Sequence, residues 1–209
     1  MGKGRAGRCG PPRDSLRSAG QEPYRLPDME IPPPENFALS WAAAGDRADP
    51  PLVADERELL ITFLDYHRET FALKCADLSA EQLSAAALPP STLTLHGLVR
   101  HLAGVERWWF RQQFAAENVP ALYYSAEDPD QDFEFLSGDP AEAVGTWRAE
   151  CERSREIVAE AGLDDTFARL RDGATMSLRA LLLDMITEYA RHNGHADLLR
   201  ERLDGATGY

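Results

Sequence analysis

Apolar residues recur at spacings of three and four residues through four separate stretches of the chain, and this pattern constrains the fold more than any other feature. The stretches are 53–78, 94–114, 139–158 and 177–203. Residues at such spacings lie on one face of an α-helix, and no stretch shows the regular alternation of a half-buried strand. One short extended piece is expected just before Asp172 and Gly173. The sequence therefore predicts an all-α fold in which four amphipathic helices form a four-helix bundle.

Residues 1–50 differ in composition from the rest of the chain. They are rich in glycine, proline and basic residues, lack apolar periodicity and include the proline run of "EIPPPENF". Such a segment buries too little apolar surface to offset the entropy lost on ordering it. We expect residues 1–50 to be a disordered tail and residues 51–209 to form the bundle. Translation from Met29, which would remove residues 1–28, is an alternative.

The charge and the cysteine content exclude several classes of protein. A formal net charge of −13 argues against a nucleic-acid-binding surface, which needs a basic patch. The chain lacks a run of about 18 apolar residues, so the sequence predicts no membrane span. Its three cysteines form no CxxC pair and suggest no disulfide framework, which favours a cytoplasmic protein.

Polar residues interrupt the apolar stripe of the last helix. The stripe runs through Leu178, Leu181, Met185, Glu188, His192, His195 and Leu199. An unpaired interior carboxylate is costly, so Glu188 must be bonded, coordinated or open to a cavity. The second helix directs His101 inward in the same way. One carboxylate and two imidazoles suit a divalent transition metal, and bundle cores hold metals in this manner. A hydrogen-bonded core network without metal remains the alternative.

The other histidines and one cysteine carry weaker signals. His96 lies about 140° around the helix from His101, so we assign it to the surface or to the first turn. His67 faces inward from the first helix, where it either packs in the core or lines a pocket as a substrate contact. Cys151 lies on the core face of the third helix and is expected to be a buried thiol rather than a nucleophile.

An acidic connection links the second and third helices. Asp128, Asp130 and Asp132 imitate the start of a calcium loop, but Phe133 stands where the sixth position needs glycine. The twelfth position also lacks glutamate, so we expect a solvated acidic loop. The connection, 117–139, is long for a compact domain, and such length is typical of a functional loop or of a segment that spans a bundle.

Two motifs and a closing stretch resemble a known protein family. They read "LVRHLAGVERWWF", "MITEYARHNGHADLLRE" and "DGATG", and the resemblance covers about 52–208. Together they resemble the DinB-like metal-dependent superfamily, most closely its actinobacterial mini-circle-type proteins. The resemblance implies a four-helix bundle with the helices in up-down-down-up order, and the long connection fits that crossover.

The resemblance also implies a ligand set. Many DinB-like proteins bind a divalent metal through one histidine of the second helix and two histidines, four apart, on the last helix. His101 matches the first ligand, while Glu188 and His192 occupy the pair, a departure from two histidines. This set is similar to that of mycothiol-dependent maleylpyruvate isomerase, which holds zinc. Zinc is therefore the expected metal, with nickel or manganese as alternatives. His195 falls where many relatives carry glutamine, so it is either a substitute ligand or a pocket residue.

The activity that the resemblance implies is that of a metal-dependent enzyme. A low-molecular-weight thiol, mycothiol, would bind as the metal-bound thiolate and attack a small electrophile, which gives an S-transferase or an isomerase. His195 or His67 would act as general base or orient the substrate. Three alternatives stay open. They are a metal-dependent hydrolase, a non-catalytic bundle that binds metal or a small ligand, and a metal-free bundle whose polar seam serves a homodimer or a core network.

Overall fold

Capping side chains set the starts of the long helices. The computed structural model of the chain describes residues 47–125, 128, 131–134, 136 and 138–208. In each case the cap accepts a hydrogen bond from a backbone N–H of the helix that follows, and the caps are Asp55, Thr94, Asp139 and Ser177. The expected disordered tail falls almost wholly on residues 1–46, which lie outside the described residues, so it stays a prediction.

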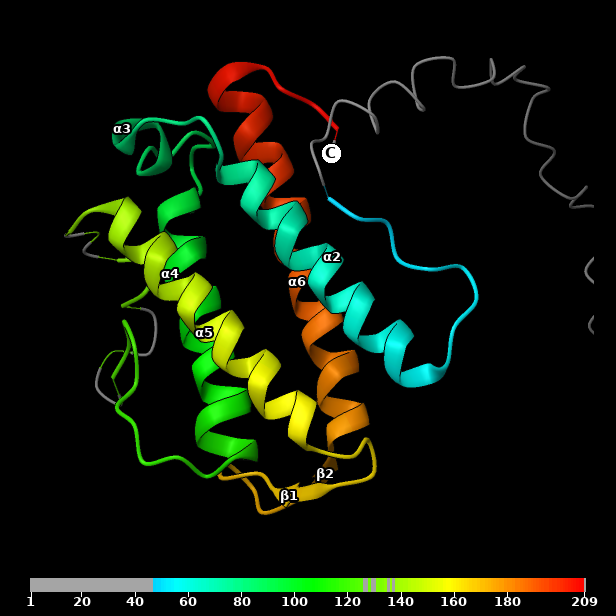
Figure 1. Ribbon diagram of the computed structural model, residues 1–209. Helices are drawn as coiled ribbons and strands as arrows, with labels where there is room; N and C mark the ends of the chain where they lie inside the picture. The colour runs from blue at the N-terminus through cyan, green and yellow to red at the C-terminus, as the bar shows by residue number, and fades with distance from the viewer. Residues whose placement is uncertain (1–46, 126–127, 129–130, 135, 137, 209) are drawn as a thin grey trace, which may run out of the picture. The chain divides into compact units, whose positions relative to one another are not determined.

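The long helices form an up-down-down-up bundle. They are α2 (Glu56–Cys75), α4 (Leu95–Glu106) with its π-helical continuation η1 (Arg107–Phe114), α5 (Pro140–Glu160) and α6 (Leu178–Asp204). Figure 1 shows α2 and α6 running in one direction and α4 and α5 in the other. The predicted all-α bundle is therefore confirmed.

The core is built from the apolar faces of these helices. α2 packs along α6, and α4 packs along α5 and also meets α6. The largest fully buried side chains are Tyr189, Phe71, Phe110, Leu64, Leu95, Leu98, Leu102, Leu178, Leu181, Leu182, Met185 and Leu199. Complete burial of one such apolar side chain contributes about 1.5–3 kcal/mol, so this core supplies the main driving force for folding.

Shorter elements close the ends of the bundle. α3 (Ala80–Leu83) follows α2, and an antiparallel hairpin of β1 (Thr166–Ala168) and β2 (Thr175–Ser177) precedes α6. The expected single extended piece is thus a hairpin, whose turn contains Gly173 at a φ of +69°. Glycine adopts a positive φ more readily than other residues, which explains why position 173 is a glycine.

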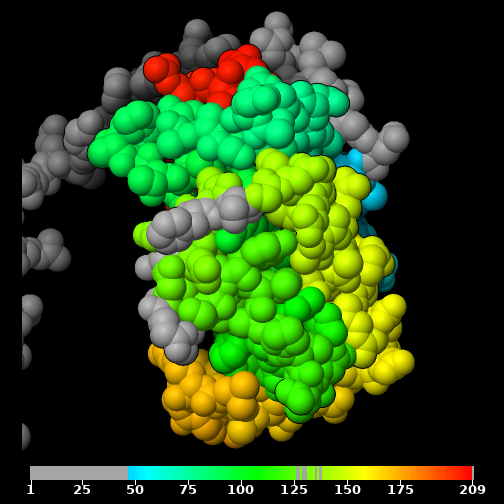
Figure 2. Space-filling view, turned by 90° about the vertical axis from the view of Figure 1, so that its left-hand side faces the viewer, coloured from blue at the N-terminus to red at the C-terminus, as the bar shows by residue number. Residues whose placement is uncertain are grey.

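The connection between η1 and α5 returns along one face of the bundle. Figure 2 shows this face, with the described residues of the connection (green to yellow-green) spread over it and the hairpin (orange) at one end. Its length therefore reflects a crossover between two helices that run in the same direction. Among the described residues, no helix is both long and apolar enough to span a membrane.

Candidate metal centre

Three side chains from two helices meet at one point between α4 and α6. Glu188 Oε1 lies 3.2 Å from His101 Nε2 and 3.1 Å from His192 Nε2. One potential ligand atom from each residue lies within 4.8 Å of the others. The fold therefore brings together the three residues that the sequence predicts as ligands, although 87 positions separate His101 from Glu188. Their role as ligands stays a prediction.

The three side chains of the cluster face one another across α4 and α6 and are partly exposed to solvent. Glu188 and His192 are four residues apart, so they stack on one face of α6, and His101 faces them from α4. The side chains of His101 and Glu188 are 22% and 25% exposed. A small ion or ligand can therefore reach the three donor atoms from solvent.

Asp132 holds the far side of the His101 ring. Its Oδ2 lies 2.7 Å from His101 Nδ1, and the residue is only 5% exposed. The expectation of a solvated loop is wrong for Asp132, because the connection folds back onto α4; Asp130 lies outside the described residues. Phe133 stacks on the same imidazole, with ring centroids 4.9 Å apart. With Nδ1–H donated to Asp132, Nε2 is the nitrogen left for a ligand.

The charges in the cluster stabilise one another. Burial disfavours the charged form of His101, but hydrogen bonds to Asp132 and Glu188 outweigh it and raise its pKa to about 9. Hydrogen bonds from His101 and His192 hold the pKa of Glu188 well below its usual range. Two carboxylates thus share one imidazole, and this arrangement attracts a cation.

Of the two histidines predicted to be catalytic, His195 lies beside the cluster and His67 makes its described contacts elsewhere. Nδ1 of His195 is 3.3 Å from Nδ1 of His192, so His195 borders the cluster. The described contacts of His67 lie elsewhere, with Asn193, whose Nδ2 donates to the His67 carbonyl oxygen at 3.0 Å, and with the ring of Tyr66. Burial lowers the pKa of both histidines, which favours neutral imidazoles. Their catalytic roles stay predictions.

His96 and Cys151 are both buried. His96 lies in the first turn of α4, but it is 2% exposed and its Nδ1 is 3.1 Å from Ser84 Oγ, so a surface position is wrong. The segment that contains α3 covers it, which helical phase alone does not reveal. Cys151 is 3% exposed, as the core-face position predicts.

A cavity of about 300 Å³ opens beside the cluster. It is lined by His101, Gly104, Val105, Trp108, Tyr124, Asp132 and Phe133. Most of these side chains are apolar, and His101 and Asp132 at one end are hydrogen-bonded to each other through Nδ1 and Oδ2. The cluster therefore adjoins an apolar space large enough for a small organic molecule.

Comparison with known sequences and structures places the chain in a family. The sequence profile of the mycothiol S-transferases matches residues 59–205. The chain belongs to the mycothiol S-transferase family. This confirms the resemblance to DinB-like proteins. A crystal structure described as the conserved protein of a locus from Enterococcus faecalis is similar at a TM-score of 0.53 and 14% identity, covering 74% of this chain and all 100% of that one. That likeness supports the fold alone. No curated protein sequence matches the chain.

The residues of this mycothiol S-transferase family member fit a divalent metal. Two imidazole nitrogens and one carboxylate oxygen are ligands that such ions take, and one such atom from each residue lies within 4.8 Å of the others. Asp132 accepts the second N–H of His101, which is the usual outer support of a metal-binding histidine. The possible His–Glu–His site therefore agrees in chemistry with a metal-dependent family.

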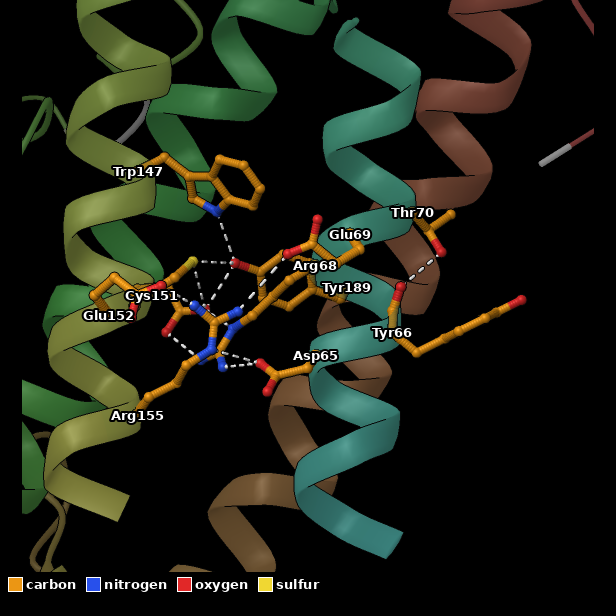
Figure 3. A network of polar contacts seen from close by, with 11 residues as sticks. Asp65, Tyr66, Arg68, Glu69, Thr70, Trp147, Cys151, Glu152, Arg155 and Tyr189 are labelled. Carbon is orange, nitrogen blue, oxygen red and sulfur yellow. Dashed lines mark hydrogen bonds and ion pairs between the residues drawn. The ribbon is translucent and has the colours of Figure 1, made fainter. Parts of the chain in front are cut away.

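A second polar cluster, which the apolar stripes of the sequence did not indicate, lies deeper in the bundle and draws on α2, α4, α5 and α6. Glu106 is fully buried and accepts hydrogen bonds from Arg68 Nη2 at 2.7 Å and from Tyr189 Oη at 2.7 Å. Trp147 Nε1 donates to Tyr189 Oη at 2.8 Å, and Cys151 Sγ lies 3.6 Å from that oxygen. Figure 3 shows Arg68 from α2, Trp147 and Cys151 from α5, and Tyr189 from α6 directed toward one another. This cluster is closed to solvent, so its role is structural.

Proposed function

We propose that the protein is a divalent-metal-dependent S-transferase or isomerase that uses mycothiol, with zinc held by His101, Glu188 and His192. The observation that carries this proposal is the convergence of three donor atoms at a partly exposed point beside a cavity. Membership of the mycothiol S-transferase family supports the choice of thiol. Two imidazoles and a carboxylate suit zinc and leave a position for a substrate; nickel or manganese are alternatives.

The side chains around the cluster hold its imidazoles in place. Asp132 accepts the Nδ1–H of His101 and so keeps Nε2 free as a donor atom. With Nε2 of His192 as the donor atom to the metal, its proton would sit on Nδ1, 3.3 Å from Nδ1 of His195, and the proton of His195 would then be on Nε2. That N–H can donate to a substrate oxygen, so His195 orients the substrate rather than removing a proton.

The reaction joins a sulfur to an electrophilic carbon. A divalent ion at this point favours the deprotonated form of a thiol, which is the nucleophilic form at neutral pH. The thiol proton leaves to solvent, the sulfur bonds to carbon, and a leaving group departs or a double bond shifts. The chain's own thiols are not needed, because burial raises the pKa of Cys151 far above neutrality.

Metal analysis of variants tests the ligand set. Native protein should carry stoichiometric metal, and His101→Ala and His192→Ala should lose it, because two remaining ligands make a poor transition-metal site. His67→Ala is the matched control, since it removes an imidazole and leaves all three donor atoms in place. Stoichiometric metal in both ligand variants would disprove the site.

Thiol consumption tests the reaction. Metal-loaded protein should consume mycothiol in the presence of an electrophile, and His101→Ala should not. Turnover without any thiol would instead support a hydrolase. A metal-loaded protein without turnover in either assay would be a binding protein.

A further inference from the structure

Two glycines of α4 allow the connection to approach the helix backbone on either side of His101. Gly97 and Gly104 lie four residues before and three residues after His101, so the three share one face of α4. A Cβ on Gly104 would lie 3.3 Å from the carbonyl oxygen of Leu122 and 3.4 Å from the ring of Tyr124. Glycine at position 104 therefore sets how closely the connection, which forms one wall of the cavity, approaches α4.

The cavity between these surfaces has an apolar wall and a single polar end. Val105 and Trp108 from the helical side face Tyr124 and Phe133 from the connection. No lysine or arginine is among the described residues that line it. A carboxylate placed there would lose its hydration and meet the carboxylate of Asp132.

The volume of the cavity and its aromatic walls further limit the class of molecule that can occupy it. A cavity of about 150 Å³ is enough to hold benzene, and this one measures about 300 Å³. Aromatic side chains on its walls favour stacking or edge contacts with a flat ring. Mycothiol carries its cysteine on hydroxyl-rich units, and Arg191 and His195, which border the cluster on the α6 side, offer hydrogen-bond donors to such units.

We infer that this cavity receives the electrophile, and that the electrophile carries a planar aryl group without an anionic substituent a few bonds from its reactive carbon. The inference rests on the proposed function, because the cavity ends at His101, one of the three proposed ligands. Gly104 is then a residue that determines specificity. A larger side chain there pushes Tyr124 outward and disturbs the aryl site while leaving the donor atoms in place.

A matched series of chloroacetamides tests the substrate class. Thiol and metal-loaded protein react with 2-chloroacetamide, its N-phenyl derivative and the 4-carboxyphenyl derivative, which share one leaving group. We expect kcat/KM for the N-phenyl compound to exceed that of either other compound about tenfold or more, one-ring burial being worth at least that factor. Equal values, or preference for the carboxylate, would overturn the inference and leave the proposed function intact.

Substitutions of glycine test the position. Gly104→Val should lower kcat/KM for the N-phenyl compound much more than for 2-chloroacetamide, and so remove most of the preference for the aryl compound. Gly145→Ala is the matched control, because it is a helical glycine in α5 with open space around its Cβ position. Trp108→Leu, on the same helical side of the cavity, serves as the second variant if Gly104→Val does not fold. An unchanged aryl preference in a folded cavity variant would overturn the inference.

Binding without turnover separates this inference from the proposed function. Acetanilide, which cannot react, should bind metal-free protein in saturation-transfer NMR, and Gly104→Val should weaken that signal. Binding of acetanilide by a protein that never consumes thiol would support the aryl cavity and refute the transferase. Absence of any acetanilide signal would overturn the aryl cavity.

Discussion

Replacing Glu106 with glutamine should destabilise the protein strongly and leave its metal site intact. The Glu106 carboxylate is fully buried and accepts from Arg68 Nε at 2.8 Å and from Nη2 at 2.7 Å. Glutamine keeps the shape and an acceptor for Tyr189, but removes the negative charge opposite Arg68. The guanidinium would keep Asp65, a partly exposed carboxylate 2.9 Å from Nη1.

The magnitude follows from the burial of the pair. Removal of one partner of a buried ion pair costs about 3–5 kcal/mol, because the other charge stays buried without compensation. The remaining contact of Arg68 with Asp65 places Glu106→Gln at the lower end, about 3 kcal/mol. For a domain of this size each kcal/mol shifts Tm by about 2–4 °C, so Tm should fall by about 6–12 °C.

Urea and thermal unfolding followed by circular dichroism measure this loss. Arg68→Met combined with Glu106→Gln should recover most of it, since no unpaired charge then remains in the core. Arg169→Ala, which removes an exposed ion pair with Asp172, is the control and should leave Tm unchanged within error. If Glu106→Gln lowers Tm by less than about 2 °C, or if the double variant is as unstable as the single one, the reasoning is refuted.

Three further outcomes are expected. Asp132→Asn should weaken metal binding about 10–100-fold in a chelator competition, because an amide holds the Nδ1–H of His101 less strongly; equal affinity would remove Asp132 from the site. Burial raises the pKa of Cys75 to about 12 and that of Cys151 higher still, so each stays a neutral thiol at pH 7–9 and gains reactivity only at higher pH. Peptide mapping after iodoacetamide treatment of native protein should find both unmodified, and rapid labelling at pH 7 would contradict this. Arg100→Ala should speed proteolysis within the connection, since Arg100 donates to carbonyl oxygens of the segment 131–134; cleavage at the wild-type rate would show that other contacts hold it.

Helix starts could be predicted from sequence because caps act locally. In the structure α4 begins after Thr94 and α5 begins after Asp139, with Pro140 in its first turn. Each cap bonds to a backbone N–H only two or three residues later, so it needs no distant partner. α3 was missed because four residues are too few for apolar periodicity, although Ser79 and Gln82 form a capping box there. The tertiary cover over His96 was missed for a different reason, because no local pattern reports which segment folds over a helix.

The three residues that meet at the candidate site could be predicted, whereas the side chains that support them could not. Glu188 and His192 are four residues apart on one helix, so phase alone pairs them. Asp132 lies 31 positions from His101 in a connection without periodicity, and only the folded chain brings the two together. The strict three–four stripe also missed Tyr189, because a helix has 3.6 residues per turn and the buried face drifts from Glu188 to Tyr189. That drift is the reason Glu188 remains partly exposed.

The Arg68–Glu106 pair left a signal of a different kind. Both residues continue runs of leucine spaced by four, and the runs are Leu60, Leu64, Arg68 and Leu98, Leu102, Glu106. A charge at a core position of each of two helices predicts a buried pair, since a single buried charge is prohibitively costly. The sequence could therefore have revealed this cluster.

The buried cluster around Glu106 (the closed cluster) explains how the partly exposed cluster of His101, Glu188 and His192 (the open cluster) keeps its geometry. α4 contributes His101 to the open cluster and Glu106 to the closed one, while α6 contributes Glu188 and Tyr189 in turn. The 2.7 Å bond between Glu106 and Tyr189 fixes the spacing of α4 and α6 little more than one helical turn from the candidate metal centre. In the closed cluster the carboxylate is saturated and buried, so it can only hold the helices. In the open cluster one oxygen of Glu188 serves two imidazoles and remains partly exposed, so a cation can replace their protons. Rigid support beside an exposed donor set is what a precise metal site requires.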